Sequence, residues 1–355
     1  MLIPQSRRGF LSGLGAAAVG ITVTGLGGCH NPAANQVNFY TWDTYVGRNT
    51  LSGFEKQSGV HVSMSLYSSN DELFAKLRGG NPGYDVVVPS HDFVQRMAKA
   101  DLLTPLDHAK IPNMANIAPQ FQHPAFDPER KYSMPYTWLV LGIGYRKSKV
   151  DGVPDSWKWV LDSDRYKGRI ALLSDAPDLC RLAEIYLGKN PNVFDRATLK
   201  EVEALLIRQK PNVATFHDDN GQDLLLGGDV DIVIEYNGDI AQVIREDKDL
   251  AFVVPREGSL IQSDQLCIPV GAPNPDGAHA FINYLLSAEA GADIARTIAY
   301  PTPNAAALRA MDAAYRDNPV IFPPQAALAK CQYAQYLGED AYRAFQDVIT
   351  RVRAA

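Results

Sequence analysis

The stretch from Val60 to Leu77 reads VHVSMSLYSSNDELFAKL and joins a strand pattern to a helix pattern. Apolar and polar residues alternate from Val60 to Tyr67, which predicts a strand with one buried face. Ser69 and Glu72 have the spacing of a capping box, which predicts a helix that continues through Leu77. A strand that leads directly into a helix is the building unit of an α/β fold.

The same alternation extends along the chain on both sides of this stretch. Strands are predicted over residues 37–41, 60–67, 84–88, 168–173, 213–216, 230–236, 251–254 and 265–270. Helices are predicted over residues 51–57, 69–77, 94–99, 178–187, 199–209 and 240–246, and the chain is mostly helical from residue 276 onward. Strands and helices at this spacing indicate βαβ units and parallel sheets, so we expect an α/β fold.

Length and composition limit the class of protein. The chain has 355 residues, and domains hold about 100–200 residues each, so two domains or lobes are expected. Its 46% apolar and 21% charged residues are typical of a globular protein and exclude a disordered or fibrous one. The net charge of −6 argues against a nucleic-acid partner and fits a cationic ligand.

The first 28 residues have the features of an export signal. Arg7 and Arg8 precede an uncharged stretch that ends at Gly28, which is the arrangement of a twin-arginine (Tat) signal. This stretch contains seven glycines and is too weakly apolar for a membrane-spanning helix, which needs about 20 predominantly apolar residues. We therefore expect residues 1–28 to be a Tat-type lipoprotein signal peptide; the alternative is a signal-like helix that is retained.

The four cysteines are consistent with an exported protein. Leu26-Gly27-Gly28-Cys29 resembles a bacterial lipobox, so we expect Cys29 to carry a lipid and to anchor the protein in the periplasm. The alternative is cleavage without lipidation. Cys180, Cys267 and Cys331 then allow at most one intramolecular disulfide, and three buried thiols are an equally good reading.

Motifs of catalysis are absent from the sequence. There is no G-x-x-x-x-G-K-[ST], no H-E-x-x-H and no G-x-S-x-G motif. His217-Asp218-Asp219 at a strand end could be an acid–base or metal cluster, but the seven histidines have no ligand spacing. The sequence therefore predicts no enzyme, no cofactor and no metal site.

Acidic and aromatic residues gather where the predicted strands end. They lie in Trp42-Asp43-x-Tyr45, Ser90-His91-Asp92, Asp175-x-x-Asp178 and Tyr236-Asn237-Gly238-Asp239, with Asp264 just before a strand and Tyr300 before a proline-rich turn. Ligands of open α/β sheets bind at the carboxyl ends of the strands. These motifs therefore indicate a binding site.

An aliphatic amine fits this mixture of residue types. An ammonium group has three donors and no acceptor, so it needs carboxylates or hydroxyls. Its hydrocarbon chain prefers aromatic walls, and the cation can also lie over a ring face. Taken singly, each residue has a structural alternative: a tyrosine or tryptophan can pack in the core, and Asp178 or Asp239 can cap a helix.

At these residues the chain resembles the periplasmic spermidine/putrescine-binding proteins of ABC importers. The resemblance is carried by residues 39–46 (FYTWDTYV), 84–90 (YDVVVPS), 132–138 (YSMPYTW) and 300–304 (YPTPN). It implies a periplasmic-binding-protein-like fold with two α/β lobes, a central cleft and a crossover hinge. Carried over to this chain, lobe 1 is 37–138 plus 263–308 and lobe 2 is 139–262 plus 309–355.

The resemblance also implies a set of ligand-binding residues. The matching positions are Trp42, Asp43, Tyr45, Ser90, Asp178, Tyr236, Asp239, Asp264 and Tyr300, and Asp92 occupies a further pocket position. In the family, carboxylates matching Asp178, Asp239 and Asp264 hold ammonium groups, and rings matching Trp42 and Tyr236 flank the hydrocarbon chain. A late family glutamine falls at either Gln332 or Gln335.

Three positions depart from the family pattern. Tyr236 replaces a tryptophan, Gln262 replaces an aromatic residue, and Asp92 replaces the tyrosine of the spermidine branch. These changes remove ring surface and add an acid, so a shorter, more polar or differently charged amine also fits.

The leading hypothesis is a monomeric, non-catalytic receptor that captures a cationic amine such as putrescine or spermidine and delivers it to an ABC permease. A second hypothesis keeps the fold but takes an amino acid, an opine-like conjugate or a metal chelate, because Gln262 and His91 can serve a polar ligand group. A third is an exported enzyme that uses His217 or the aspartates.

Overall fold

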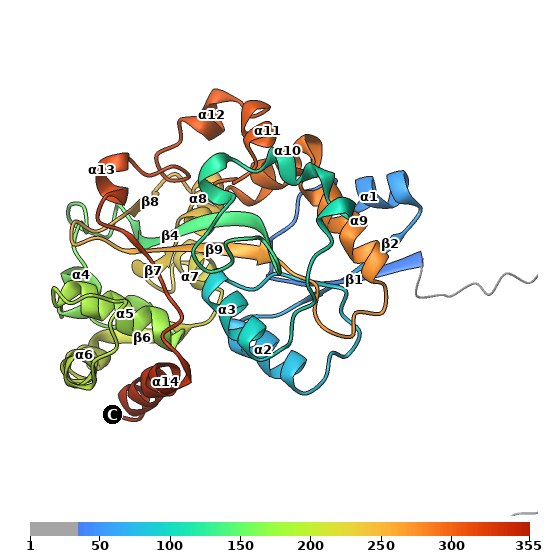
Figure 1. Cartoon of the computed structure of the whole chain (residues 1–355). Coiled ribbons are helices and arrows are strands. Elements are labelled where there is room, and N and C mark those ends of the chain that lie inside the picture. The colour runs from blue at the N-terminus through green and yellow to red at the C-terminus, as the bar shows by residue number, and fades with distance from the viewer. Residues whose placement is uncertain (1–34) are drawn as a thin grey trace, which may run out of the picture. The chain divides into compact units, whose positions relative to one another are not determined.

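The computed structural model describes residues 35–355 (Figure 1). The predicted signal peptide and Cys29 lie outside these residues. Within the described part, no helix combines the length and the apolar character needed to cross a membrane. Its Cys180, Cys267 and Cys331 are all free thiols, so no disulfide links them.

A three-stranded parallel sheet carries the N-terminal part of the fold. Its strands are β1 (Gln36–Thr41), β2 (His61–Leu66) and β3 (Val86–Val87) in the order β2-β1-β3, and α1 (Thr50–Ser58), α2 (Asn70–Arg78) and α3 (His91–Lys99) alternate with them. Local signals set the helix ends as the sequence predicts. The Ser69 hydroxyl accepts a hydrogen bond from the backbone N–H of Glu72, and Gly59 ends α1 with a φ of 71°.

A seven-stranded mixed sheet carries the rest of the fold. Its strands are β4 (Met134–Arg146), β5 (Ile170–Leu173), β6 (Val213–His217), β7 (Ile232–Tyr236), β8 (Leu250–Val253), β9 (Leu260–Leu266) and β10 (Gln332–Tyr333). The order is β10-β9-β4-β7-β5-β6, with β8 also paired to β4. Strand β5 is parallel to β6 and β7, as predicted.

The long strand β4 was not predicted, and it changes two expectations. It runs antiparallel to β7, β8 and β9, so the expectation of purely parallel sheets is wrong for this sheet. The prediction of a strand over residues 265–270 is also wrong in its bounds, because pairing of β9 with β4 fixes the strand at Leu260–Leu266.

Helices cover both sheets (Figure 1). The remaining helices are α4 (Lys158–Leu161), α5 (Ala176–Tyr186), α6 (Arg196–Gln209), α7 (Gly221–Gly227), α8 (Asn237–Glu246), α9 (Pro275–Leu285), α10 (Ala288–Ile298), α11 (Ala305–Arg309), α12 (Ala313–Arg316), α13 (Gln325–Leu328) and α14 (Glu339–Ala354). Short 3-10 helices lie at His108–Lys110, Pro112–Asn116, Pro119–Phe121 and Lys210–Asn212. Helix α14 packs against α5 and α6.

Two large apolar cores define two α/β lobes. One core draws its buried side chains from residues 37–139 and 266–300, and the other draws them from 141–260 and 334–352. Strand β4 supplies both, because Leu139 belongs to the first core and Leu141 to the second. The predicted lobe borders at 138/139 and 262/263 fall within β4 and β9, and the exact boundaries stay a prediction.

Candidate functional site

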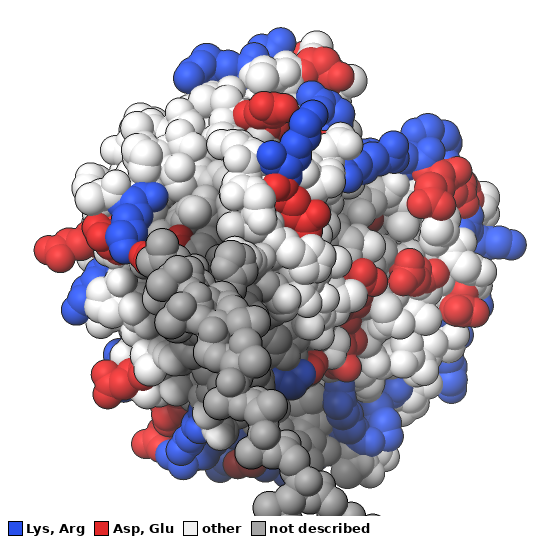
Figure 2. All heavy atoms as spheres, turned by 90° about the vertical axis from the view of Figure 1, so that its right-hand side faces the viewer, with Lys and Arg blue, Asp and Glu red and all other residues white. Residues whose placement is uncertain are grey.

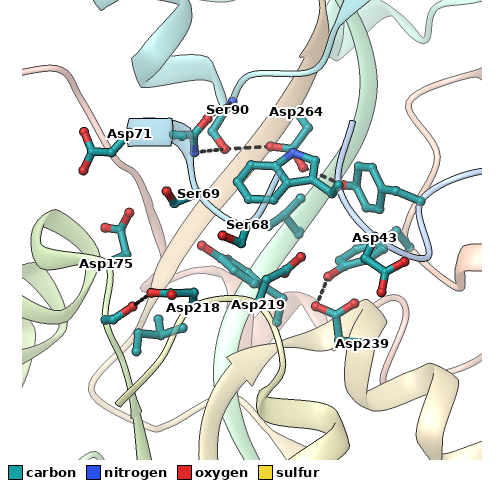
Figure 3. Close-up of a pocket in the computed structure, with 18 of the residues that line it drawn as sticks. Asp43, Ser68, Ser69, Asp71, Ser90, Asp175, Asp218, Asp219, Asp239 and Asp264 are labelled. Atoms are coloured by element: carbon teal, nitrogen blue, oxygen red, sulfur yellow. Dashed lines mark hydrogen bonds between the residues drawn. The ribbon is translucent and has the colours of Figure 1, made fainter. Parts of the chain in front are cut away.

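A cavity of about 160 Å³ lies where the strands of both sheets end (Figure 3). Its walls follow the carboxyl ends of β1, β3, β5, β6 and β7 and include the first turns of α2 and α8. A single buried water needs only about 10–15 Å³ of such space, so a small organic molecule fits. The lining residues are Trp42, Asp43, Tyr45, Ser68, Ser69, Asn70, Asp71, Ser90, Leu139, Leu173, Ser174, Asp175, Asp218, Asp219, Tyr236, Asp239, Asp264, Tyr300, Gln346 and Arg353.

Most of the predicted binding residues lie in this wall. Eight of the ten line the cavity: Trp42, Asp43, Tyr45, Ser90, Tyr236, Asp239, Asp264 and Tyr300. Asp92 and Asp178 do not line it. The cavity brings together segments that are far apart in the sequence, as the rule for strand ends predicts.

Asp264 is held in the cavity wall by two hydroxyl groups. Its Oδ2 accepts a hydrogen bond from the Tyr45 hydroxyl at 2.5 Å, and its Oδ1 accepts one from Ser90 at 2.8 Å. Thr137 donates in turn to the Tyr45 oxygen at 2.5 Å, because the single tyrosine proton is directed at Asp264. Burial raises the pKa of Asp264 to about 6, although the hydrogen bonds from Tyr45 and Ser90 lower it.

Asp239 is held in a similar way on the other lobe. The Tyr300 hydroxyl donates to its Oδ2 at 2.5 Å, and Tyr300 is itself fixed by a hydrogen bond from Tyr315 to its backbone carbonyl. Burial raises the pKa of Asp239 to about 7; the hydrogen bond from Tyr300 opposes this rise and the charge of Asp264 adds to it. The two carboxyls thus repel each other when no cation lies between them.

Aromatic rings complete the wall. The Trp42 indole N–H donates to the Val88 carbonyl at 2.9 Å, and its ring packs against Tyr67 with 4.5 Å between the centroids. The rings of Tyr45 and Tyr300 meet edge to face at 5.4 Å. These contacts fix the rings before any ligand arrives, so little side-chain entropy is lost on binding.

Sequence reasoning missed several acids that line the cavity. Asp219 and Asp218 follow β6, and they were considered only as part of an acid–base or metal cluster. Burial, together with the charges of Asp239 and Asp264, raises the pKa of Asp219 to about 9. Asp175 was named only through its spacing to Asp178, and it caps α5 by accepting from the Asp178 N–H at 2.9 Å. The strand-end rule that found Asp43 applies to all three.

Serines and one further acid come from the start of α2. Ser68, Ser69 and Asp71 line the cavity, and only the capping role of Ser69 was foreseen. Figure 3 shows Asp71, Asp175 and Asp218 on one side of the view and Asp43, Asp239 and Asp264 on the other. The carboxylates therefore surround the cavity rather than forming one cluster.

Negative charge is concentrated in the cavity. Seven of its lining residues are aspartates, and Arg353 is the one basic residue among them. On the face drawn in Figure 2, basic and acidic side chains of the described residues are interspersed. The cavity therefore favours cations far more strongly than that face does.

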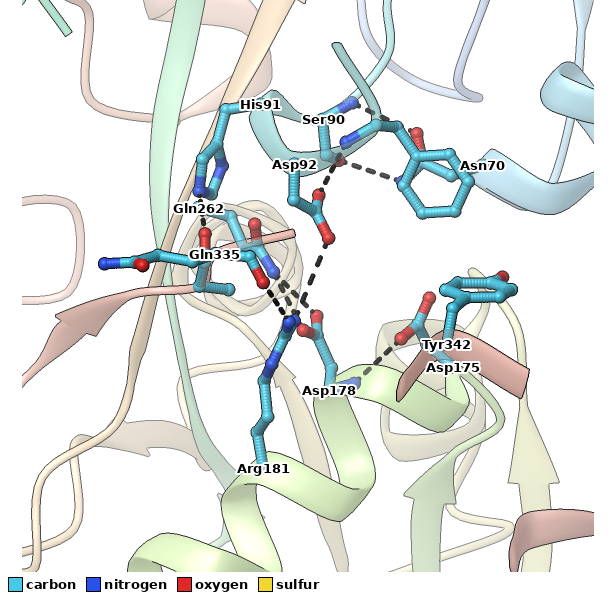
Figure 4. A network of polar contacts seen from close by, with 12 residues as sticks. Asn70, Ser90, His91, Asp92, Asp175, Asp178, Arg181, Gln262, Gln335 and Tyr342 are labelled. Carbon is cyan, nitrogen blue, oxygen red and sulfur yellow. Dashed lines mark hydrogen bonds and ion pairs between the residues drawn. The ribbon is translucent and has the colours of Figure 1, made fainter. Parts of the chain in front are cut away.

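Asp92 and Asp178 lie in a separate polar network beside the cavity (Figure 4). The Gln262 amide donates to both carboxylate oxygens of Asp178, at 2.8 and 3.0 Å, and Tyr236 donates to Oδ2 at 2.9 Å. Asp92 lies 3.8 Å from the guanidinium of Arg181. Both acids thus already have partners within the protein, and the binding role expected for them stays a prediction.

The residues behind the other two hypotheses are also occupied. The Gln262 amide donates to Asp178. His91 contacts the Ala334 carbonyl through Nε2 and accepts a hydrogen bond from the Ser263 N–H through Nδ1. His217 is buried, hydrogen-bonds the Ile234 carbonyl and does not line the cavity, and burial lowers its pKa to about 4. The described residues contain no group of three or more side chains arranged to hold a metal ion.

Comparison with known proteins adds an independent result. Residues 50–323 match the family model described as bacterial extracellular solute-binding protein. The chain is 32% identical over 331 residues to "Spermidine/putrescine-binding periplasmic protein 1" of Haemophilus influenzae, which covers 91% of this chain and 90% of that protein. It is 34% identical over 343 residues to "Putrescine-binding periplasmic protein PotF" of Escherichia coli, with 90% and 91% covered.

A solved structure shows the same architecture. The spermidine/putrescine ABC transporter substrate-binding protein PotD from Streptococcus pneumoniae superposes with a TM-score of 0.77 at 28% identity. The match covers 90% of this chain and 99% of that protein.

Proposed function

The chain belongs to the bacterial extracellular solute-binding proteins, and from this premise we propose that it captures a polyamine in the acidic cavity and delivers it to an ABC permease. The observation that carries the proposal is the pair Asp239 and Asp264. Each carboxyl is buried in the cavity wall and oriented by a tyrosine hydroxyl, with aromatic rings beside it. The relatives that are named for binding putrescine or spermidine support this ligand class.

Family membership confirms several predictions made from the sequence. The resemblance to polyamine-binding proteins is confirmed, as are the two-lobed periplasmic-binding-protein-like fold and the prediction of a binding protein rather than an enzyme. The residue-by-residue ligand contacts are part of the proposal.

A diamine would bind through its two charged ends and its hydrocarbon chain. Charge-assisted hydrogen bonds contribute about 1.5–3 kcal/mol each, and an ammonium over a ring face adds about 0.5–2 kcal/mol. Two charge-assisted contacts and one ring contact give about 3.5–8 kcal/mol before the entropy of association is subtracted. Burial of the hydrocarbon chain has to add to them for a Kd in the micromolar range, which corresponds to about −8 kcal/mol. Carboxylates from both lobes contact the ligand together only when the lobes close on it, so the ligand shifts the population toward the closed form.

The proposal places the protein in the periplasm, attached to the membrane through a lipid on Cys29. The paired arginines and the lipobox-like sequence before Cys29 support this location. Replacing Cys29→Ala should move the protein from the membrane fraction to the soluble periplasmic fraction. Equal distribution of the variant and the parent would contradict lipid anchoring.

Calorimetry with purified protein tests the ligand class. Putrescine, cadaverine, spermidine and a panel of amino acids are titrated into the parent and into Asp239→Asn and Asp264→Asn. Each variant should bind the preferred amine at least about 1.5 kcal/mol more weakly while keeping its fold. Asp340→Asn, at an exposed position on α14, is the matched control and should bind like the parent. Unchanged binding by both cavity variants would show that the site is elsewhere.

A further inference from the structure

The polar network of Asp92, Asp178, Arg181 and Gln262 beside the cavity limits the length of the ligand. We propose that Arg181 acts as a built-in cation that occupies one end of the cleft, so that the cavity takes a short diamine in preference to a triamine. This inference rests on the proposed function and names its substrate more closely.

Arg181 is buried among acids. Only 2% of the residue is exposed, its Nη1 lies 3.8 Å from Oδ2 of Asp92, and its Nη2 donates to the backbone carbonyl of Gln335. Its guanidinium also lies 5.6 Å from the ring centroid of Phe345 on α14. The Nε and Nη1 groups have no hydrogen-bond partner within residues 35–355. Charge, more than directed hydrogen bonds, therefore keeps this side chain in place.

Three buried acids are compensated by this one guanidinium. Burial raises the pKa of Asp92, of Asp178 and of Glu184, and in each case the charge of Arg181 lowers it again. A buried cation with several acids around it does for the protein what a bound ammonium does in a polyamine site. The chain itself thus supplies a positive charge at this end of the cleft.

Gln262 occupies the remaining binding capacity of Asp178. Its amide bonds both carboxylate oxygens of Asp178, and Tyr236 donates a third hydrogen bond. An ammonium group that used this acid would have to displace the amide and would meet the like charge of Arg181. Arg181, Asp92 and Asp178 are absent from the cavity wall, which agrees with a cleft that stops before them.

The carboxylates that stay accessible define a shorter ligand. Asp43, Asp219, Asp239 and Asp264 line the cavity together with Trp42. These groups supply partners for two ammonium groups and a ring face for the chain between them. The other three lining aspartates are already partly used, Asp71 by Arg96 and Gln346, Asp175 by the Asp178 N–H and Asp218 by Ser174. A third ammonium on the Arg181 side would therefore meet partly used acids and the like charge of Arg181.

Titration of putrescine and spermidine into the parent and into Arg181→Met tests the inference. The parent should bind putrescine about tenfold or more tightly than spermidine, which is the loss of one charge-assisted contact. Methionine keeps an unbranched apolar stem and removes the guanidinium and its charge, so the acids around it become a site for a third ammonium. The ratio of the two affinities should then shift toward spermidine by about tenfold.

Two further variants keep the test decisive. Arg353→Met removes an exposed, solvent-screened positive charge from the cavity wall outside the network, so it should change the ratio of the two affinities by less than about twofold. Asp92→Asn removes a negative charge beside Arg181, so spermidine should bind even more weakly relative to putrescine. If Arg181→Met does not fold, this variant tests the length limit on its own. The inference would be overturned if the ratio of the putrescine and spermidine affinities stayed within about twofold of the parent's in both Arg181→Met and Asp92→Asn. A change that small is below the effect of one charge-assisted contact.

The outcomes also separate this inference from the proposed function. Absence of binding of either amine to the parent overturns the proposed function and this inference with it. Tight binding of both amines with equal affinity overturns the length limit alone. Binding of an amino acid that Arg181→Met abolishes would assign the guanidinium to a ligand carboxylate and would likewise overturn it.

Discussion

The backbone of Gly238 lies directly against the ring of Tyr300, and a β-carbon at position 238 would overlap the Cγ and Cδ atoms of that ring. Gly238 stands in the first turn of α8, immediately before Asp239, which receives the Tyr300 hydroxyl. The missing side chain thus sets the distance between an aromatic wall of the cavity and one of its carboxyls.

Gly238→Ala should therefore damage both folding and binding. The extra methyl group has to displace Tyr300 or α8, and overpacking of this kind costs about 1–3 kcal/mol of stability. Loss of the hydrogen bond to Asp239 should also weaken putrescine binding. Urea unfolding and calorimetry measure the two effects. Gly227→Ala is the control, because a β-carbon at position 227 meets only the Asp229 carboxylate, at an ordinary 3.7 Å.

Amine binding should strengthen as the pH rises. The pKa of Asp264 is raised to about 6 and that of Asp239 to about 7, so both carboxyls are largely protonated at pH 5 in the empty protein. A cation binds the ionised forms, so putrescine should bind at least about tenfold more weakly at pH 5 than at pH 8. Calorimetry across this range measures the change. Equal affinities at pH 5 and pH 8 would exclude capture by these two carboxyls.

Binding should also release protons at pH 8. The pKa of Asp219 is raised to about 9 by burial and by the charges of Asp239 and Asp264. An ammonium in the cavity favours the ionised carboxylate and lowers this pKa, so the proton leaves. Titrations in two buffers with different ionisation enthalpies count the protons. Asp219→Asn should release fewer than the parent, whereas the control Asp340→Asn, at an exposed position on α14, should release about as many.

The stability of the empty protein should respond to Asp239 in the opposite sense. The folded-state pKa of about 7 lies above the unfolded value of about 3.9. The protonated carboxyl therefore contributes stability that is fully present below pH 4 and is lost as the pH rises through 7. Asp239→Asn mimics the protonated form at every pH. The free energy of unfolding of the variant minus that of the parent should therefore be larger at pH 8 than at pH 5.

Urea unfolding of the two proteins measures this difference. The comparison with the parent matters because His91 and His217, whose pKa values are lowered to about 4, make stability rise with pH between about 4 and 6.5. Their effect is the same in both proteins and cancels. A difference that does not change between pH 5 and pH 8 would contradict the raised pKa of Asp239.

Local signals predicted much of the fold, and they failed where distant segments decide. Ser69, Glu72 and Gly59 set helix ends through their immediate neighbours, so the sequence places α1 and α2 within two residues. The bounds of β9 depend on its register with β4, about 125 residues earlier in the chain, and no local pattern encodes that pairing.

The site shows the same limit. The strand-end rule brought Trp42, Asp43 and Ser90 to one cavity, because the topology of parallel strands leaves few alternatives. Asp264 lies within β9 instead and reaches the cavity through the antiparallel pairing of β9 with β4. The rule could not show that Gln262 hydrogen-bonds to Asp178 or that Arg181 lies beside Asp92, since each pair joins side chains from two different elements. The sequence thus predicted that acids lie at the strand ends. It did not predict which other side chains of the protein bond those acids.

Strand β4 has a consequence for how the molecule loses its structure. Its first half hydrogen-bonds to β9, its second half to β7 and β8, and its side chains enter both apolar cores. Neither half of the protein can come apart while leaving the other with an intact central strand. Heat should therefore melt the two halves together in one calorimetric transition, although each has a core of its own.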